Sequence, residues 1–304
     1  MGDPRDKRLE ELVGAVVESP KYRAVSEDLI RRIGLRELAA RRSLKEAIKA
    51  TRNKLHQVAG AYLDGRPDYA AWAEQLATAA EAGESELRRV SLQIMQHHAS
   101  TRERAAILES FYAQALAGLP PIRSVLDVAC GLNPLARPWM PLAADAAYYA
   151  CDVYSDMIGF LNDYFRIAGV RGQAQVCDLV GDPPGQPVDL ALVLKVLPPL
   201  EQLDKRAGLN LLRALNAEYL LVSFPARSLG GRDKGMVEHY AGRFLALAAA
   251  EGWPVERFEF ATELAFRVRI GEGRWPSPSP SQIHISPAEP DRPGLENPYP
   301  EAQN

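Results

Sequence analysis

The sequence predicts an α/β protein in which an all-helical region precedes a parallel sheet covered by helices. From about residue 5 to 118, apolar residues recur at intervals of three and four, which is typical of amphipathic helices. Beyond that point, short continuous apolar runs alternate with helix-length segments, which indicates parallel strands buried on both faces. We therefore expect a helical domain at 1–118, an α/β domain at 119–270 and a separate segment at 271–304.

Helix breakers divide the first region into about five or six expected helices. The pair Ser19-Pro20, Gly34 and the stretch "DGRPD" at 64–68 interrupt the apolar period. Ser43 is a typical N-cap before "LKEAIKATRNKLHQVAGAY". In "HHASTRER", Ser100 and Glu103 have the spacing of a capping box, which predicts a helix start at Ser100.

Apolar runs of strand length predict the sheet of the second region. They span Ser124 to Ala129, Tyr148 to Cys151, Ala174 to Cys177, Asp189 to Leu194, Tyr219 to Phe224, Val255 to Phe260 and Leu264 to Ile270. The last two are so close in sequence that we expect an antiparallel hairpin. Five βα units closed by a hairpin is the strand plan of the Rossmann-like class I methyltransferases, here with an all-helical N-terminal domain.

The segment 271–304 holds eight of the 23 prolines and almost no apolar periodicity, so we expect a disordered tail. No apolar run approaches the roughly 20 residues that a membrane span needs. The N-terminal residues lack the apolar core of a secretory signal. We expect a cytoplasmic monomer with no membrane partner.

The cysteines and the basic residues have different implications. Cys130, Cys151 and Cys177 fit neither a disulfide framework nor a metal pair, so we expect buried thiols and no metal site.

Net charge is only −3, yet residues 21–54 hold eleven Lys and Arg against four acids. This excess predicts contacts with RNA phosphates, and the alternative is a solvated helix face. The residues we assign to RNA contact here are Arg31, Arg32, Arg41, Arg42 and Lys45.

Three carboxylates lie at the ends of consecutive predicted strands: Asp127, Asp152 and Asp178. In open parallel sheets a ligand lies beyond the carboxyl ends of the strands, so these acids predict a site for an extended adenosine ligand. The stretch "VLDVACGLNP" lacks the glycine-rich turn that a dinucleotide pyrophosphate requires, which favours S-adenosylmethionine. The alternative is that each Asp caps a helix or ends a strand in a turn.

Each carboxylate is suited to one part of S-adenosylmethionine. Asp127 can orient the methionine moiety through its loop, Asp152 can accept from the ribose hydroxyls, and Asp178 with the Leu179 backbone can read adenine. A helix turn would bring Arg104 beside the first loop, where its guanidinium could pair with the cofactor carboxylate.

Five stretches together closely resemble the aminoglycoside-resistance methyltransferases that modify N7 of a guanine in the decoding site of 16S rRNA, the guanine-1405 type. They are "LHQVAGAY", "HHASTRER", "VLDVACGLNPLA", "LALVLKVLPPLE" and "LLVSFPARSLGGRDKGM", and the resemblance covers about residues 15 to 270. It implies transfer of a methyl group from S-adenosylmethionine to that guanine in the 30S subunit, aminoglycoside resistance, and an rRNA-docking role for the helical domain.

The resemblance also implies roles for individual residues. Its cofactor positions are Tyr62, His98, Ala99, Ser100, Arg104, Ala129, Gly131, Asp152, Asp178, Leu179, Leu194 and Gln202. Its positions toward the flipped guanine or the RNA are Lys195, Arg232, Met236 and Glu263. In "SFPARSLGGRDKGM", flexible glycines combined with Arg227, Arg232 and Lys234 are suited to closing over a phosphate or an extruded base.

The residues favour a ring nitrogen as the methyl acceptor. "LKVLPP" places Lys195 where enzymes that methylate amino groups carry an (N/D)PP(Y/F) motif, and neither the fourth nor the fifth strand is followed by a cysteine nucleophile. Guanine N7 has an available lone pair, so alignment suffices and no general base is expected. Lys195 or Arg232 could donate to guanine O6. Two alternatives remain: a small-molecule methyltransferase whose helices form a lid, and a non-catalytic RNA-binding module.

Overall fold

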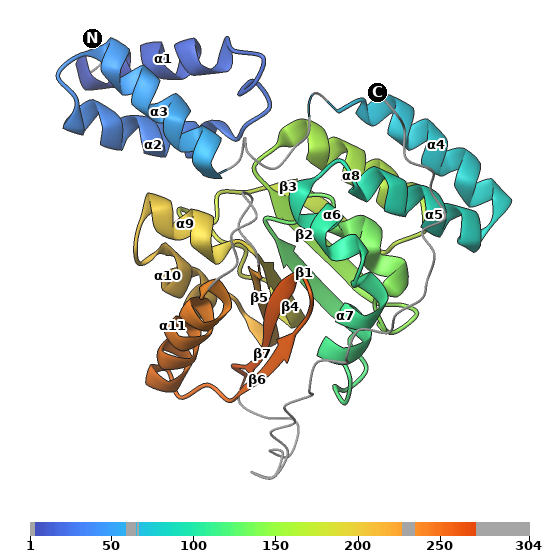
Figure 1. Ribbon diagram of the computed structural model, residues 1–304. Helices are drawn as coiled ribbons and strands as arrows, with labels where there is room; N and C mark the ends of the chain where they lie inside the picture. Colours follow the sequence, from blue (N-terminus) through green and yellow to red (C-terminus); the bar gives the residue numbers. More distant parts are fainter. Residues whose placement is uncertain (1–3, 59–64, 66, 227–234, 272–304) are drawn as a thin grey trace, which may run out of the picture.

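The structure, a computed structural model, describes residues 4–58, 65, 67–226 and 235–271. A central sheet is flanked by helices on both faces, and three N-terminal helices lie beside its upper edge in Figure 1. Tyr62, Arg227, Arg232, Lys234 and all but the first residue of the expected tail lie outside the described residues.

The sheet has the predicted strands in the order β3-β2-β1-β4-β5-β7-β6. Their bounds are β1 Ser124–Val128, β2 Ala147–Asp152, β3 Gly172–Val176, β4 Val188–Leu194, β5 Ala217–Pro225, β6 Val255–Glu259 and β7 Glu263–Arg269. The first five strands run parallel, and β7 is antiparallel to β5 and β6. The predicted Rossmann-like class I architecture is confirmed, and its strand order reverses between β1 and β4, where such sheets bind ligands.

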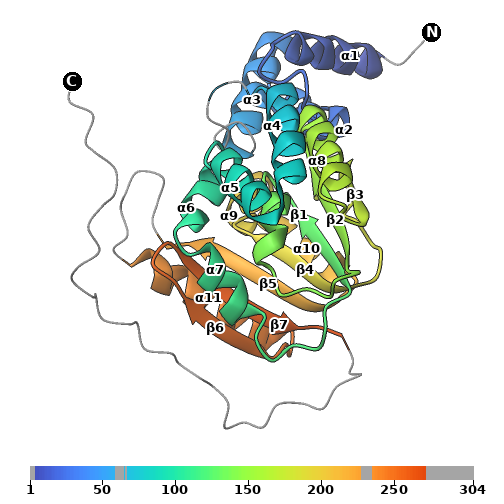
Figure 2. The same cartoon turned by 90° about the vertical axis from the view of Figure 1, so that its right-hand side faces the viewer.

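Helices cover the two faces of the sheet (Figure 2) and bury separate apolar clusters. On one face lie α4 Tyr69–Ala82, α5 Glu84–Met95, α6 Ala99–Ala105, α7 Leu108–Ala115, the short helix η1 Asn133–Trp139 and α8 Ser155–Ile167; on the other lie α9 Leu197–Leu203, α10 Ala207–Ala214 and α11 Met236–Ala250. Along β1, Val125 belongs to the first cluster, whereas Leu126 and Val128 belong to the second. This alternation follows from the two-residue period of a strand.

The helices before the sheet form two packing groups. Helices α1 Pro4–Val17, α2 Glu27–Ala40 and α3 Leu44–Val58 enclose their own apolar cluster, and we call them the N-terminal bundle. Helices α4 to α7 instead bury residues such as Trp72 and Phe111 in the same cluster as the sheet. The described residues hold seven helices in this region, against the five or six expected. The grouping was not predicted, because helical periodicity reveals an apolar face but not the surface it packs against.

Two of the predicted helix starts have different outcomes. Ser43 caps its helix as predicted, since its Oγ accepts from Glu46 N–H at 3.3 Å. The capping box at Ser100 is wrong: α6 begins at Ala99, with His98 as N-cap residue and no side-chain cap. Thr101 Oγ1 instead donates to the Met95 carbonyl at 2.6 Å, which ties this helix to the preceding one.

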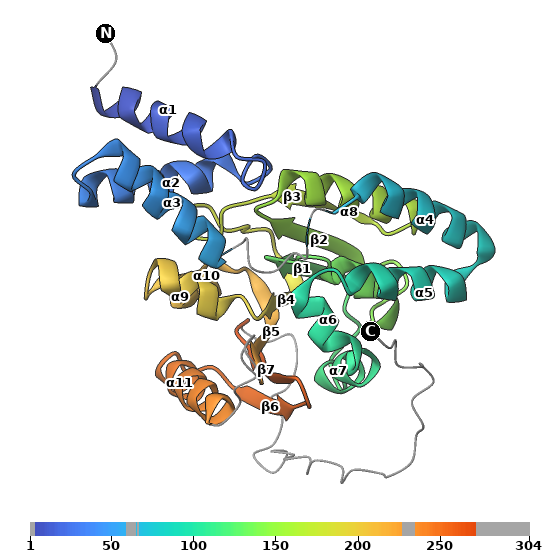
Figure 3. The same cartoon turned by 45° about the horizontal axis from the view of Figure 1, so that its top comes forward.

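The N-terminal bundle packs against the loop that follows β2. Ser26 N–H donates to the Val153 carbonyl at 2.7 Å, and Ser155 N–H donates to the Ala24 carbonyl at 2.8 Å. Helix α3 also contacts α9, and Figure 3 shows both beside the carboxyl ends of the strands. The bundle therefore borders the edge of the sheet at which a ligand is expected. No helix in the described ranges is long and apolar enough to cross a membrane.

Candidate functional site

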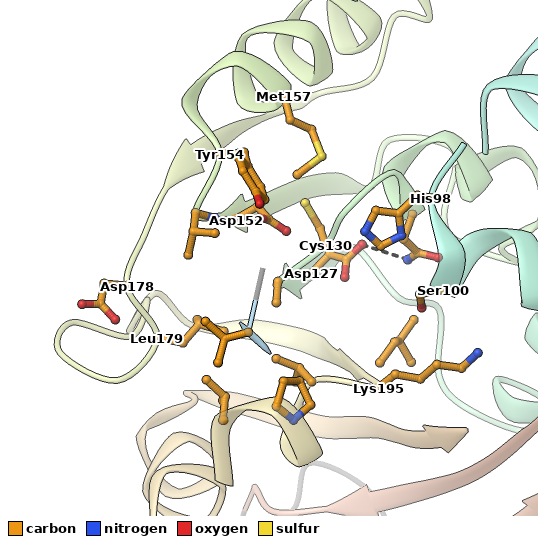
Figure 4. A pocket seen from close by; sticks show the side chains of 18 of the residues that line it. His98, Ser100, Asp127, Cys130, Asp152, Tyr154, Met157, Asp178, Leu179 and Lys195 are labelled. Atoms are coloured by element: carbon orange, nitrogen blue, oxygen red, sulfur yellow. Dashed lines mark hydrogen bonds between the residues drawn. The ribbon is translucent and has the colours of Figure 1, made fainter. Parts of the chain in front are cut away.

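A cavity opens at the carboxyl ends of β1, β2 and β4 and contains about 950 Å³ of empty space, its mouth included. Figure 4 shows Asp178 at one end and Lys195 at the other, with Asp127 and Asp152 between them. Polar lining residues are His98, Ser100, Arg104, Asp127, Asn133, Asp152, Tyr154, Asp178 and Lys195; apolar ones include Leu29, Val58, Met157, Leu179, Val180, Leu194 and Leu200. The three carboxylates identified from the sequence thus share one cavity.

The loop after β1 makes a tight turn with only one glycine. Ala129 and Gly131 both have left-handed backbones, with φ of 48° and 51°. Such a conformation costs a residue with a Cβ roughly 1–2 kcal/mol. A Cβ on Gly131 would also lie 2.7 Å from the His98 ring. Gly131 is therefore needed for the close approach of His98, whereas Ala129 bears its strain at a position that lines the cavity.

Asp127 forms hydrogen bonds with the end of this loop and with the neighbouring strand β2. Its Oδ2 accepts from Asn133 Nδ2 at 2.8 Å and from the Tyr148 hydroxyl at 2.7 Å. Asn133 Oδ1 in turn accepts from Arg104 Nη1 at 2.9 Å and from the Tyr112 hydroxyl at 2.7 Å. Burial raises the pKa of Asp127 to about 7, although the hydrogen bonds that it accepts from Asn133 and Tyr148 oppose the shift. Asn133 thus links the loop to Arg104.

Asp152 holds the loop from the neighbouring strand. Its Oδ2 accepts from Gly131 N–H at 2.9 Å and its Oδ1 from Val153 N–H at 2.7 Å. Burial raises the pKa of this carboxyl despite those bonds. Each oxygen keeps a lone pair that could accept from a ligand hydroxyl.

Asp178 is held from two sides. Its Oδ1 accepts from Val180 N–H at 3.2 Å, and its Oδ2 forms an ion pair with Arg32 of the N-terminal bundle. The guanidinium of Arg32 lies beside this carboxylate, and the expected contact of Arg32 with RNA phosphate stays a prediction. The bundle therefore contributes to the wall at the Asp178 end, together with Leu29 and Val58.

Arg104 and Glu263 form a fully buried ion pair. Arg104 Nη2 lies 2.7 Å from Glu263 Oε1, and Nε lies 3.0 Å from Oε2. Burial disfavours both charges. The charge of Glu263 nevertheless raises the pKa of Arg104, and the charges of Arg104 and Lys195 lower the pKa of Glu263. Arg104 lines the cavity as predicted, and its guanidinium keeps N–H donors that could bind a ligand.

Glu263 is buried, and its expected place toward the guanine or the RNA stays a prediction. Its side chain has no exposed surface, and Ser223 Oγ donates to it at 2.5 Å. Its described charged partners are Arg104 and Lys195. Sequence reasoning could not find this pairing, because 159 residues separate Arg104 and Glu263.

Lys195 follows β4 directly and has a left-handed backbone with φ of 61°. Its Nζ lies 2.7 Å from Glu103 Oε2 and 3.2 Å from Glu263 Oε2. The residue is 7% exposed and lines the cavity at the end opposite Asp178. Its role toward the target stays a prediction.

The remaining predicted site residues divide into three groups. His98, Ser100, Leu179 and Leu194 line the cavity, and Ala99 is buried behind it. Gln202 is exposed and is not among the lining residues, whereas Leu200 and Leu203 of the same helix are; its role stays a prediction. Met236 begins α11, is partly exposed and does not line the cavity.

Several lining residues were not identified from the sequence. Tyr154 could have been found, since an aromatic side chain two positions beyond Asp152 continues the same strand-end loop. Leu29 and Val58 carried no signal, because their contribution depends on where the N-terminal bundle packs.

The basic segment is more paired than its composition suggested. Arg31 bonds to both Glu10 and Glu27, and Arg41 bonds to Glu37. Arg42 and Lys45 are exposed, and no described carboxylate pairs with them. These two residues are therefore better placed to meet an external anion than Arg31, Arg32 or Arg41.

The donors and acceptors of the cavity fit S-adenosylmethionine. Arg104 offers a guanidinium to a carboxylate, Asp152 offers acceptors to a ribose diol, and Asp178 lies beside the apolar surface of Leu179 and Val180, which suits an adenine ring. A phosphate-binding glycine-rich turn does not occur in the loop after β1.

Comparison with known proteins agrees with this geometry. Residues 18–267 match the model of the family described as ribosomal RNA methyltransferase (FmrO). The chain is 39% identical to a 16S rRNA (guanine(1405)-N(7))-methyltransferase of Frankia casuarinae, over 87% of this chain and 95% of the relative. It is 36% identical to a protein of the same name from Micromonospora echinospora, over 88% and 98%. Among solved structures, the 16S rRNA methyltransferase RmtF in complex with S-adenosyl-L-homocysteine superposes with a TM-score of 0.73 at 32% identity, over 88% and 99%.

Proposed function

This chain belongs to the family of FmrO-type ribosomal RNA methyltransferases, and we propose that it methylates N7 of guanine 1405 in 16S rRNA with S-adenosylmethionine as donor. The observation that carries the proposal is the cavity in which Arg104, Asp127, Asp152 and Asp178 come together at the carboxyl edge of the sheet. Relatives that share most of the length of this chain carry the name of that activity.

The residues of the cavity would hold the cofactor along its length. Arg104, kept in place by Glu263 and Asn133, pairs with the carboxylate of the methionine moiety. Asp152 accepts from the ribose hydroxyls, and Asp178 with Leu179 binds adenine. S-adenosylmethionine, when bound, supplies an electrophilic methyl group on a positively charged sulfur. With adenine at Asp178, the methionine end points toward Lys195.

Lys195 would orient the target base. Guanine N7 lies beside O6, and a Lys ammonium donates readily to that edge. N7 brings its own lone pair, so the chain needs to align the base and to exclude water, and no side chain has to remove a proton. Arg232 and Met236 are further candidates for contact with the base or the RNA.

We assign the docking surface to the N-terminal bundle and the substrate to the assembled 30S subunit. Arg42 and Lys45 are exposed cations on a rigid helical body, as contact with the backbone of a folded RNA requires. The protein would act as a monomer in the cytoplasm, where its modification of the decoding site gives aminoglycoside resistance. Arg227, Arg232 and Lys234 would contact a phosphate or the extruded base.

The two alternative functions predict different substrates. Leu29 and Val58 make the bundle part of the cavity wall, as a lid over a small molecule would be. A small-molecule enzyme would, however, leave the exposed cations of the bundle without a partner, and a non-catalytic module would not need Asp152 and Asp178 directed into one cavity.

Labelled S-adenosylmethionine incubated with 30S subunits, protein-free 16S rRNA or free aminoglycoside separates these functions. We expect label in 30S subunits and little in the other two samples. Asp152→Ala should abolish incorporation and weaken S-adenosylhomocysteine binding in calorimetry. Label in the small molecule, or cofactor binding without label in any substrate, would refute the proposed function.

A further inference from the structure

Four charged side chains meet beside the Lys195 end of the cavity. We call them the charge cluster, and its members are Arg104, Lys195, Glu103 and Glu263. Arg104 pairs with Glu263, and Lys195 lies between Glu263 and Glu103. Two cations face two carboxylates, so the cluster is neutral as a whole. Its members are buried to different degrees, since the side chains of Arg104 and Glu263 are not exposed at all, whereas that of Glu103 is 31% exposed.

Glu103 is the member that has no place in the function so far. It lies on α6 between Arg102 and the cofactor residue Arg104, and its Oε2 accepts from Lys195 Nζ at 2.7 Å. That distance is shorter than the 3.2 Å to Glu263, so Glu103 is the nearer counter-ion of the ammonium. An ammonium has three N–H donors, which leaves one for a further acceptor.

Methyl transfer moves a positive charge toward this cluster. The N7 lone pair forms the new bond to the methyl carbon while the carbon–sulfur bond breaks, and its electron pair stays on sulfur. Sulfur becomes neutral and the guanine ring becomes cationic. An uncompensated ammonium that donates to O6 would repel this charge through a partly desolvated medium. The carboxylate of Glu103 offsets the ammonium and leaves its hydrogen bond available.

We propose that Glu103 is a positioning residue for methyl transfer, which holds Lys195 toward the target base and balances its charge as the base becomes cationic. This inference rests on the proposed function. It assigns to Glu103 an effect on turnover that is exerted through Lys195 and not through the cofactor.

The test compares Glu103→Gln with Glu109→Gln, a control that removes the same charge from an exposed side chain of α7. On 30S subunits, Glu103→Gln should lower kcat on the order of tenfold, while the affinity for S-adenosylhomocysteine and the melting temperature stay those of the wild type. Glu103→Asp, which keeps the charge on a shorter side chain, should recover part of the rate. Glu109→Gln should leave all three quantities unchanged.

A double variant shows whether the effect passes through Lys195. In a Lys195→Met background, the further change Glu103→Gln should cost much less than it does alone, because coupled residues are not additive. Wild-type turnover by Glu103→Gln, an equal loss of cofactor affinity, or full additivity with Lys195→Met would each overturn the inference. Failure of the wild type to label 30S subunits would instead overturn the proposed function.

Discussion

Glu263→Gln tests whether a buried carboxylate holds the Arg104 guanidinium in place. The side chain is fully buried, accepts from Arg104 and Ser223, and lies 3.2 Å from Lys195 Nζ. Glutamine keeps the shape but removes the charge and turns an amide N–H₂ toward donors. Removing one partner of a buried ion pair costs about 3–5 kcal/mol, because the remaining charge is left uncompensated. We expect the free energy of unfolding to fall by about that amount.

Urea unfolding of wild type and variant at neutral pH measures this difference. Glu86→Gln is the matched control, because Glu86 forms an exposed pair with Arg89 three residues away and surface pairs contribute little. A loss for Glu263→Gln no larger than that of the control would refute the reasoning, since it would mean that Arg104 needs no carboxylate partner.

The loss of stability caused by Glu263→Gln should depend on pH. The pKa of Glu263 is lowered in the folded protein, because Arg104 and Lys195 together outweigh the effect of burial. A carboxyl of this kind contributes stability above its unfolded pKa of about 4.3, and the contribution is lost as pH falls through the folded value. The gap in unfolding free energy between wild type and Glu263→Gln should therefore narrow below about pH 4.

Three further predictions concern the loop after β1 and the bundle. Gly131→Ala should lower the melting temperature and weaken S-adenosylhomocysteine binding, because the added Cβ would meet a histidine ring at 2.7 Å; unchanged calorimetry would contradict this. Since burial raises the pKa of Asp127 to about 7, the wild type should lose stability relative to Asp127→Asn as pH rises from about 4 to 7, and parallel urea profiles would argue against the shift. Charge reversal of Arg42 and Lys45 should weaken 30S binding and reduce the slope of log K against log salt concentration by about 1.5. Reversal of Arg31, which is already paired with Glu10 and Glu27, should weaken binding less. Equal losses of affinity would contradict a special role for Arg42 and Lys45.

The sheet and the carboxylates at its edge could be predicted from the sequence because both depend on local patterns. Apolar runs of strand length predicted every described strand, and Asp127, Asp152 and Asp178 each lie at the carboxyl end of such a run. In a parallel sheet these positions meet at one edge whatever the detailed packing. The loop after β1 turns without a glycine-rich motif because Ala129 adopts the left-handed backbone that glycine normally supplies.

The pairing of distant side chains could not be predicted in this way. Glu263 and Arg104 meet only because β7 returns beside β5 while α6 packs over the first loop. Arg32 lies in a basic run yet turns toward Asp178, because the N-terminal bundle docks on the loop after β2. Composition gives the sign of a segment's charge, whereas its partners follow from tertiary packing.

The most direct test of the proposed activity is the position of the methyl group. Wild-type protein is incubated with 30S subunits and S-adenosylmethionine, and the 16S rRNA is then cleaved by chemistry specific for N7-methylguanine and mapped by primer extension. We expect one new scission, at guanine 1405, that is absent when Asp152→Ala replaces the wild type. Scission at another guanine, or incorporated label without any scission, would contradict methylation of N7 at this position.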